Sequence, residues 1–287
     1  MRNGISRFVP DDGYAASFGE QWARWRRVQL DSVTGKPLSR ARLFEGTRWP
    51  EDLTGQTVLE LGCGAGRFTE VLLDAGAEVW AVDASSAVDA ARANLGEHER
   101  LELAQADLFD LPFAEGAFDR VLCFGVLQHT PDPRRAFLAA SGYGEWLAAD
   151  VYRTQPYVDR WSAKTLWRPL TTRLPRDRLR RIVEWYVPRW LPIDTRLARV
   201  PKLGRVLTAV VPCWNYTGLY PLDEDELVAW AVLDTFDALS PRYDEPQTLQ
   251  TVQEWAREAE LVDADVRYGG NGIVVTGRRP SARASRT

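Results

Sequence analysis

A run of glycines and two acidic residues occur where apolar segments of the chain end. The run Gly62-Cys63-Gly64-Ala65-Gly66 follows an apolar segment and precedes a helical pattern. Glycines there let a ligand approach the backbone, and the helix N-terminus offers N–H groups to polar or anionic atoms. Asp83 ends the next apolar segment, and Asp107 follows a third one. Because carboxylates can accept the hydroxyls of a ribose and the amino group of an adenine, this order predicts a nucleoside-binding site.

The glycine run differs from the dinucleotide fingerprint. That fingerprint is GxGxxG, and its third glycine would fall at position 67, which is Arg67. The sequence therefore disfavours a pyrophosphate ligand and, with it, a nicotinamide-dependent oxidoreductase.

The candidate for acid–base chemistry is His129, which follows a further apolar segment in Val126-Leu127-Gln128-His129. An imidazole that titrates near neutral pH can take a proton from a hydroxyl or an amine. The structural alternative is a histidine that only hydrogen-bonds the loop ahead of Asp132. Cys63 and Cys123 lie in no Pro-Cys or paired-cysteine context, so we expect both to be packed side chains.

Strands and helices alternate around these residues and would position them at one edge of a sheet. The expected strands are 57–61, 78–83, 101–106, 118–124 and 146–152, and the expected helices are 67–75, 86–95 and one that opens at Asp132 and Pro133. A helix at 248–261 and strands at 263–268 and 272–277 follow, joined by a Gly-rich hairpin turn. The expected fold class is α/β: a doubly wound, Rossmann-like sheet, mostly parallel, with a terminal antiparallel hairpin and a helical insertion.

An aromatic series precedes this alternation. Tyr14, Phe18, Trp22 and Trp25 have the spacing of one helical face, which predicts a cap helix lying on another element. Plain packing is the simplest function of such rings. A cap that closes over a cation could use the same rings, because a cation over an aromatic face is stabilised by roughly 0.5–2 kcal/mol.

The segment between the fifth strand and the last helix is divided by charge. Residues 153–205 hold fourteen basic and four acidic side chains, while residues 206–247 hold one arginine and eight acids. Pairing between the two halves is the simplest explanation. The interleaved Trp and Arg of 161–192 also suit a charged lid or a contact with a membrane surface. Nucleic acid is disfavoured as a partner, since the whole chain has a net charge of -4 and no recognition motif.

Composition excludes several other classes of protein. Of the 287 residues, 45% are hydrophobic and 26% charged, which is typical of a globular chain. The longest uncharged apolar stretch, 206–214, is far shorter than the ~20 residues of a membrane helix. The first ten residues contain no apolar core of a secretory signal, so a cytoplasmic protein is expected. The three cysteines form no CxxC pair, and no metal site is predicted.

These motifs together resemble the class I S-adenosylmethionine-dependent methyltransferases that act on small molecules. The signature of that group runs ELGCGxGxF, then D, then AD, then FDxVxxxxVLxH, and all four parts occur between Glu60 and His129. The strings YAASFGEQWARWRRVQLDS and WAVLDTFDALSPRYDEPQT also resemble an uncharacterised bacterial subgroup with a large C-terminal insertion. The resemblance implies transfer of a methyl group from S-adenosylmethionine, with S-adenosylhomocysteine as product, to an oxygen, nitrogen or carbon atom of a small-molecule or lipid-like acceptor.

The resemblance also implies a set of site residues. Glu60 would orient the ammonium of the cofactor's methionine, Asp83 would hold its ribose, and Asp107 with Leu108 would bind its adenine. The residues expected beside the methionine part are Gly62, Cys63, Gly64, Gly66, Phe124 and Gly125. His129 would be the catalytic base, and Tyr14, Phe18 and Trp22 would form part of a lid on the substrate side.

One departure from the group concerns the helix before the fifth strand. The group usually closes this helix with Pro-Gly-Gly, whereas residues 139–145 here read AASGYGE and are about one helical turn shorter. This leaves open a second function, a catalytically silent cofactor-binding scaffold or partner. The expected division of the chain is a helical cap at 1–45, the cofactor-binding core at 46–152, the insertion at 153–247, the last helix and hairpin at 248–278, and a disordered tail at 279–287.

Overall fold

The chain folds into two compact units. The computed structural model describes residues 3–155, 162–200, 204 and 208–280, so most of the expected disordered tail lies outside the described residues. The first unit comprises residues 1–26, 37–154 and 243–287, and the second comprises residues 27–36 and 155–242.

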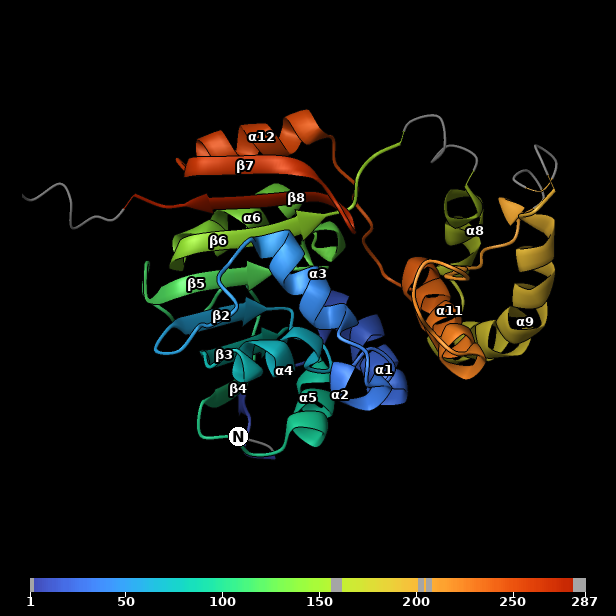
Figure 1. The fold of residues 1–287 in the computed structure, drawn as a ribbon, viewed down its shortest axis with the longest axis horizontal. Coiled ribbons are helices and arrows are strands. Elements are labelled where there is room, and N and C mark those ends of the chain that lie inside the picture. Colours follow the sequence, from blue (N-terminus) through green and yellow to red (C-terminus); the bar gives the residue numbers. More distant parts are fainter. Residues whose placement is uncertain (1–2, 156–161, 201–203, 205–207, 281–287) are drawn as a thin grey trace, which may run out of the picture. The chain divides into compact units, whose positions relative to one another are not determined.

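The first unit is built on one eight-stranded sheet with the order β1-β4-β3-β2-β5-β6-β8-β7 (Figure 1). Its strands are β1 (Ser6–Arg7), β2 (Thr57–Leu61), β3 (Glu78–Asp83), β4 (Leu101–Gln105), β5 (Phe118–Cys123), β6 (Gly144–Val151), β7 (Val262–Gly269) and β8 (Gly272–Arg278). Strands β1 to β6 pair in parallel, whereas β8 pairs antiparallel with both β6 and β7. The expected fold class, with its terminal hairpin, is confirmed.

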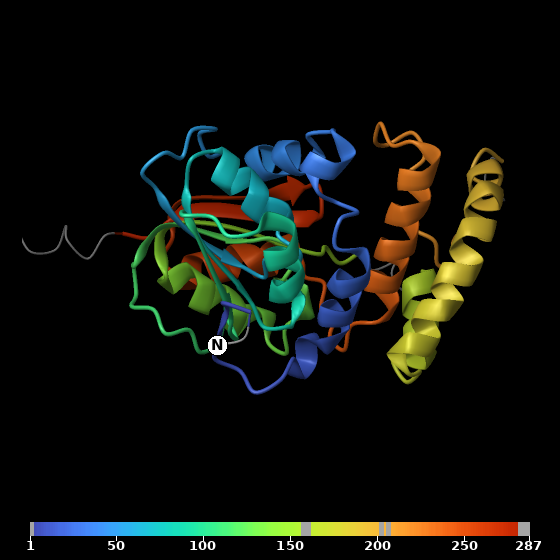
Figure 2. The same cartoon turned by 90° about the horizontal axis from the view of Figure 1, so that it is seen from below.

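Helices cover both faces of this sheet because strand residues point alternately to either side. One face packs under α3 (Leu38–Thr47), α4 (Arg67–Asp74) and α5 (Ala87–Leu95), and the other packs under α6 (Pro133–Gly142) and α12 (Leu249–Glu258). In β2, for example, Val58 joins the first core and Leu59 the second. Figure 2 shows α3 and α4 on one side of the sheet and α6 on the other.

The N-terminal segment differs from the expected cap helix in two respects. Two residues before it form β1, which adds a strand to the outer edge of the sheet beside β4. The helix α1 (Ala16–Trp25) starts after a short 3-10 turn, η1 (Gly13–Ala15), so Tyr14 lies ahead of the α-helix that carries Phe18 and Trp22. A two-residue strand carries too little periodicity to be predicted from sequence.

The shortened helix before β6 packs well. In α6, Ala136, Phe137 and Ala140 are completely buried, and the Phe137 ring lies 5.9 Å from the ring of Trp255 in α12. The predicted cap is confirmed, because the Asp132 side chain accepts a hydrogen bond from the Arg135 amide at 2.9 Å, and Pro133 occupies the first helical position. Losing a turn has therefore not exposed this face of the core.

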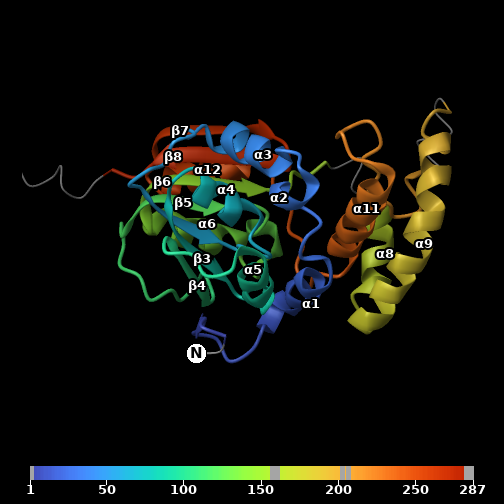
Figure 3. The same ribbon diagram turned by 60° about the horizontal axis from the view of Figure 1, so that its bottom comes forward.

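The second unit is helical (Figure 3). Its elements are α2 (Asp31–Thr34), α8 (Ala163–Thr171), α9 (Arg176–Leu197) and α11 (Glu224–Leu239). Helix α11 begins at a capping box formed by Asp223 and Glu226, and the Trp230 indole donates a hydrogen bond to the Val28 carbonyl at 2.9 Å. In the part of the chain that the structure describes, no helix is long and apolar enough to cross a membrane.

Replacing Asp132 by alanine should remove the cap of α6 and lower the free energy of unfolding by about 0.5–2 kcal/mol. Urea denaturation should report a lower midpoint with an unchanged slope. Asp110→Ala, which removes an acid outside any helix cap, serves as the control and should leave the midpoint nearly unchanged. A midpoint for Asp132→Ala equal to that of the parent would show that the cap contributes nothing to stability.

Candidate functional site

The glycine run forms a tight turn between β2 and α4. Gly62 and Gly64 have φ angles of 76° and 53°, in the left-handed region that favours glycine. A Cβ atom on Gly62 would lie 2.2 Å from a methyl carbon of Val126, and one on Gly64 would lie 2.8 Å from the indole nitrogen of Trp22. Gly66 precedes the first residue of α4, as expected. The turn therefore requires glycine both for its backbone conformation and for the close approach of its neighbours.

Asp83, at the end of β3, connects this turn to the next strand end. Its carboxylate accepts hydrogen bonds from the Gly64 amide at 2.9 Å and from the amide and hydroxyl of Ser85 at 2.8 and 2.7 Å. Burial raises the pKa of Asp83, against the effect of these three donors. A carboxylate has about four acceptor sites, so about one remains for a ligand hydroxyl without a change in these bonds. The expected ribose role thus coincides with a structural one.

Glu60 is a buried acid inside β2, one residue before the strand ends. Its carboxylate accepts a hydrogen bond from the Thr69 hydroxyl at 2.6 Å. Burial raises the pKa of Glu60 to about 7, and the nearby charge of Asp83 acts in the same direction. A carboxylate in this environment is stabilised by a cation.

Asp107 follows β4 and lies under the N-terminal segment. It accepts hydrogen bonds from the Tyr14 hydroxyl at 3.2 Å and the Phe109 amide at 3.1 Å. Burial, with the charge of Asp107, raises the pKa of Tyr14 well above its usual value, so this phenol remains a donor. The side chain of Leu108 packs in the core on the α6 side of the sheet.

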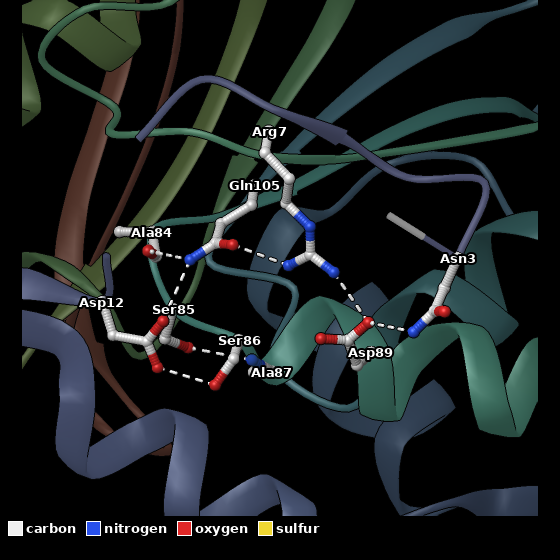
Figure 4. A network of polar contacts seen from close by, with 9 residues as sticks. All are labelled: Asn3, Arg7, Asp12, Ala84, Ser85, Ser86, Ala87, Asp89 and Gln105. Carbon is white, nitrogen blue, oxygen red and sulfur yellow. Dashed lines mark hydrogen bonds and ion pairs between the residues drawn. The ribbon is translucent and has the colours of Figure 1, made fainter. Parts of the chain in front are cut away.

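The N-terminal segment is held against the strand ends by a polar network (Figure 4). Arg7 of β1 donates to the Gln105 side chain at 2.6 Å and pairs with Asp89 at 2.7 Å. Gln105 in turn donates to Asp12 at 3.0 Å, and Asp12 also accepts from the Ser86 hydroxyl at 2.6 Å. No motif in the sequence predicts this network, and its signal there is a set of polar side chains near the expected strand ends.

Three further residues expected beside the methionine part are Cys63 after β2 and Phe124 and Gly125 after β5, and each has its own contacts. Cys63 is buried, and burial raises the pKa of its thiol well above the usual value, which matches a packed cysteine rather than a nucleophile. The Phe124 ring lies 5.8 Å from that of Phe68, edge to face. The Gly125 amide donates to Asp150 of β6, whose second oxygen accepts from Arg42 of α3 at 3.0 Å.

Sequence reasoning missed both members of the Asp150 and Arg42 ion pair. An acid inside the otherwise apolar strand expected at 146–152 was the available signal.

His129 lies in a short 3-10 turn, η2 (Leu127–His129), among aromatic rings. Its ring centroid is 5.0 Å from that of Phe18 and 5.4 Å from that of Tyr152. Its Nδ1 atom lies 3.1 Å from the backbone carbonyl oxygen of Tyr243. Because a carbonyl only accepts, the neutral imidazole carries its proton on Nδ1 and its lone pair on Nε2. The sequence did not indicate Tyr152 or Tyr243, which lie in the first unit just before residue 155 and just after residue 242.

Gln128, the residue before His129, is a buried side chain with incomplete hydrogen bonding. It is fully buried, and among the residues that the structure describes neither atom of its amide group has a hydrogen-bond partner. Leaving a buried polar group unbonded costs about 1–3 kcal/mol. This residue carries a stability cost that a ligand's polar group could offset.

All of these side chains belong to the first unit. The glycine turn, Glu60, Asp83 and Asp107 lie at the carboxyl ends of adjacent parallel strands, and His129 follows β5 at the same edge. Ligands bind at this edge in open α/β sheets. Among the described residues, no group of three His, Cys, Asp or Glu side chains could hold a metal ion.

Comparison with known proteins identifies the domain. Residues 59–142 match the family described as a methyltransferase domain. A ubiquinone biosynthesis O-methyltransferase of Thiobacillus denitrificans is 32% identical over 136 residues, which are 46% of this chain and 57% of that protein. The protein of the same description from Bordetella avium is 32% identical over 152 residues, which are 51% of this chain and 63% of that protein. The matches thus span a little over half the length of these relatives.

Among solved structures, an O-methyltransferase family protein from Burkholderia thailandensis aligns with a TM-score of 0.49 at 14% identity, over 92% of this chain and 69% of that one. The family match at 59–142 covers the glycine turn, the acidic strand ends and His129. Residues 59–142 therefore match a methyltransferase domain, in agreement with the resemblance of the sequence motifs.

Proposed function

We propose that this protein transfers a methyl group from S-adenosylmethionine to a small-molecule or lipid-like acceptor. The observation that carries the proposal is the order of acids along the sheet edge. Glu60 on β2, Asp83 on β3 and Asp107 after β4 lie on successive strands, and hydrogen bonds join the ends of β2 and β3 through Gly64. Each acid matches one part of the cofactor: the ammonium, the ribose and the adenine.

The residues of this edge fit that cofactor. Glu60 is a buried acid whose pKa is raised to about 7, so the ammonium of a methionine group would stabilise its ionised form. At Gly62 and Gly64, Val126 and Trp22 take the space of a Cβ atom, so the turn that would hold the methionine part requires glycine. Trp22 lies against Gly64 and, as part of the proposed lid, would exclude water from the methionine end.

The cofactor, when bound, supplies a methyl carbon activated by a positively charged sulfur. With the cofactor held by Glu60, Asp83 and Asp107, its methyl group would pass to the acceptor atom as the carbon–sulfur bond breaks and the sulfur becomes neutral. The protein contributes alignment and water exclusion. His129 would accept the proton of the acceptor at Nε2, while the Tyr243 carbonyl holds its Nδ1–H.

An acceptor oxygen is the finer part of this proposal. It is supported by the relatives, which are named O-methyltransferases, and by a histidine that can take a proton from a hydroxyl. Nitrogen and carbon acceptors remain within the broader proposal. The Trp- and Arg-rich helices of the second unit support a further part of the proposal, that the protein works at a membrane surface and reaches a lipid-like acceptor there.

No observation favours the alternative functions. The catalytically silent scaffold depended on the shortened helix, and α6 is N-capped and fully packed. For a nicotinamide-dependent enzyme, Arg67 replaces the third glycine, and its side chain donates to the Ser39 hydroxyl at 2.9 Å.

Residues 46–152 and 248–278 are expected to bind the cofactor, and the insertion at 153–247 is expected to lie on the substrate side. This division stays a proposal. It is supported by the membership of every proposed cofactor residue in the first unit.

Glu60→Gln tests the cofactor assignment. In the absence of ligand, Glu60 keeps its proton up to about pH 7, whereas an unfolded chain releases it near its ordinary value of 4.5. Its contribution to the free energy of unfolding is therefore largest at low pH and falls as the pH rises from about 4.5 to about 7. In Glu60→Gln this pH-dependent loss of stability should be absent. Binding an ammonium should expel the proton, so the affinity of the parent for S-adenosylhomocysteine should rise with pH up to about 7.

Isothermal titration calorimetry in two buffers of different ionisation enthalpy measures this proton release. Glu60→Gln should lose it and bind S-adenosylhomocysteine about 10- to 100-fold more weakly, because a charge-assisted hydrogen bond contributes about 1.5–3 kcal/mol. Glu102→Gln, at an exposed position of β4, should behave as the parent. Parent protein that fails to bind S-adenosylhomocysteine would overturn the proposed function itself.

His129→Ala tests the proposed base, with S-adenosylhomocysteine production from a panel of phenols and amines as the readout. Turnover should fall by about 10²-fold or more while cofactor affinity stays nearly unchanged, and the rise of the parent's rate with pH should disappear. His129→Asn keeps an N–H donor for the Tyr243 carbonyl but has no basic nitrogen. Recovery of turnover in His129→Asn would assign the histidine a structural role.

Gln128→Leu tests whether a buried amide is reserved for the acceptor. Removing the unbonded amide should raise the stability by about 1–3 kcal/mol, while the KM for the acceptor should increase. The matched control is Gln105→Leu, which should destabilise the protein because it breaks bonds to Arg7 and Asp12. Equal losses of stability in the two variants would contradict this assignment.

A further inference from the structure

Helix α9 of the second unit has two chemically different faces. The inward face carries a buried side chain at every fourth residue: Leu179, Val183, Val187 and Leu191. The outward face is not the ordinary polar surface of an amphipathic helix. There Ile182, Trp185 and Ile193 are 42, 64 and 43% exposed.

Arginines occupy the same outward face. Its exposed members are Arg178, Arg181, Ile182, Trp185, Arg189, Ile193 and Arg196, hereafter the α9 outer face. Their spacing of three to four residues places them in one stripe along the helix. A helix of 22 residues is about 33 Å long, and the stripe follows most of that length.

Among the described residues, one of the four arginines of this stripe, Arg181, is paired with an acid. The helix acids Asp177 and Glu184 are paired with Arg180, and Asp177 also with Arg181. Among the described residues, no carboxylate lies within ion-pair distance of Arg178, Arg189 or Arg196. The simple explanation of the basic segment, charge pairing with the acidic segment after it, thus does not account for these three.

Trp185 and Arg189 form one amphipathic group on the stripe. The guanidinium carbon of Arg189 lies 5.1 Å from the centre of the Trp185 ring. In such a pair the indole ring offers an apolar surface and the guanidinium a charge beside it. Tryptophan and arginine side chains both favour the boundary between hydrocarbon and headgroups. Helix α8 adds further exposed apolar side chains to this unit, at Leu166 and Leu170.

We propose that the α9 outer face binds the surface of a lipid bilayer that contains anionic lipids. The apolar side chains would enter the headgroup and acyl boundary, and the arginines would pair with lipid phosphates. A nucleic acid would use the arginines but would leave Ile182 and Ile193 in water. The helix would lie on the membrane, and this proposal does not depend on methyl transfer.

Vesicle flotation of the full-length chain tests the proposal. Vesicles of phosphatidylglycerol and phosphatidylcholine should carry the protein upward at low salt, and high salt or phosphatidylcholine alone should release most of it. Arg178→Gln and Arg189→Gln should each weaken binding about fivefold. Ile182→Ser and Trp185→Ser should weaken it at both salt concentrations, because they remove the apolar contribution.

The control variant is Arg257→Gln with Tyr268→Ser, an exposed arginine and an exposed aromatic residue of the first unit. It should float as the parent does. Thermal unfolding and S-adenosylhomocysteine binding of every variant should match those of the parent, which separates this surface from the cofactor site. Failure to bind S-adenosylhomocysteine together with normal flotation would overturn the proposed function and leave the membrane surface standing.

Three results would overturn the membrane proposal. One is no flotation of the parent with anionic vesicles. Another is flotation that the four substitutions on α9 do not change. The third is a protein that does not float but associates without lipid. It could form a dimer in light scattering that Trp185→Ser abolishes, or bind duplex DNA in a way that the arginine variants abolish.

Discussion

The carboxylate of Asp83 connects the parts of the site that sequence motifs identify separately. It accepts the Gly64 amide from the turn after β2 and the amide and hydroxyl of Ser85 after β3. The glycine turn therefore depends on an acid from the next strand to satisfy its backbone donor, and the acid depends on the turn to offset its burial. This reciprocity is possible because β2 and β3 run parallel and end at one edge.

The N-terminal segment depends on the same edge. Pairing of β1 with β4 brings the chain out where Gln105, Asp107 and Ser86 lie. Asp12 and Tyr14 then bond those side chains, and α1 continues across the site to place Phe18 near His129 and Trp22 on Gly64. A segment without regular periodicity at its start thus lies at the strand ends, held by these hydrogen bonds and by the buried side chain of Ile5.

The acids of this edge show how one environment serves both folding and chemistry. Burial raises the pKa of Glu60 and of Asp83, and among the described residues no ion pair involves either carboxylate. Gln128 adds a buried amide without a partner in the described chain. Such groups reduce stability in the absence of a ligand, which is typical of binding sites where polar groups are arranged before the ligand arrives.

The sequence by itself determined the α/β fold, the antiparallel hairpin, the glycine turn and the acids at the strand ends. These features depend on local patterns: alternating apolar residues, glycines at positive φ and the cap formed by Asp132 and Pro133. The His129 tautomer, the ion pair of Asp150 with Arg42, the strand β1 and the unbonded Gln128 were decided only by the tertiary structure. Each of them joins residues far apart in the chain, and the free energy of such contacts depends on burial and on distance in space, which local periodicity does not encode.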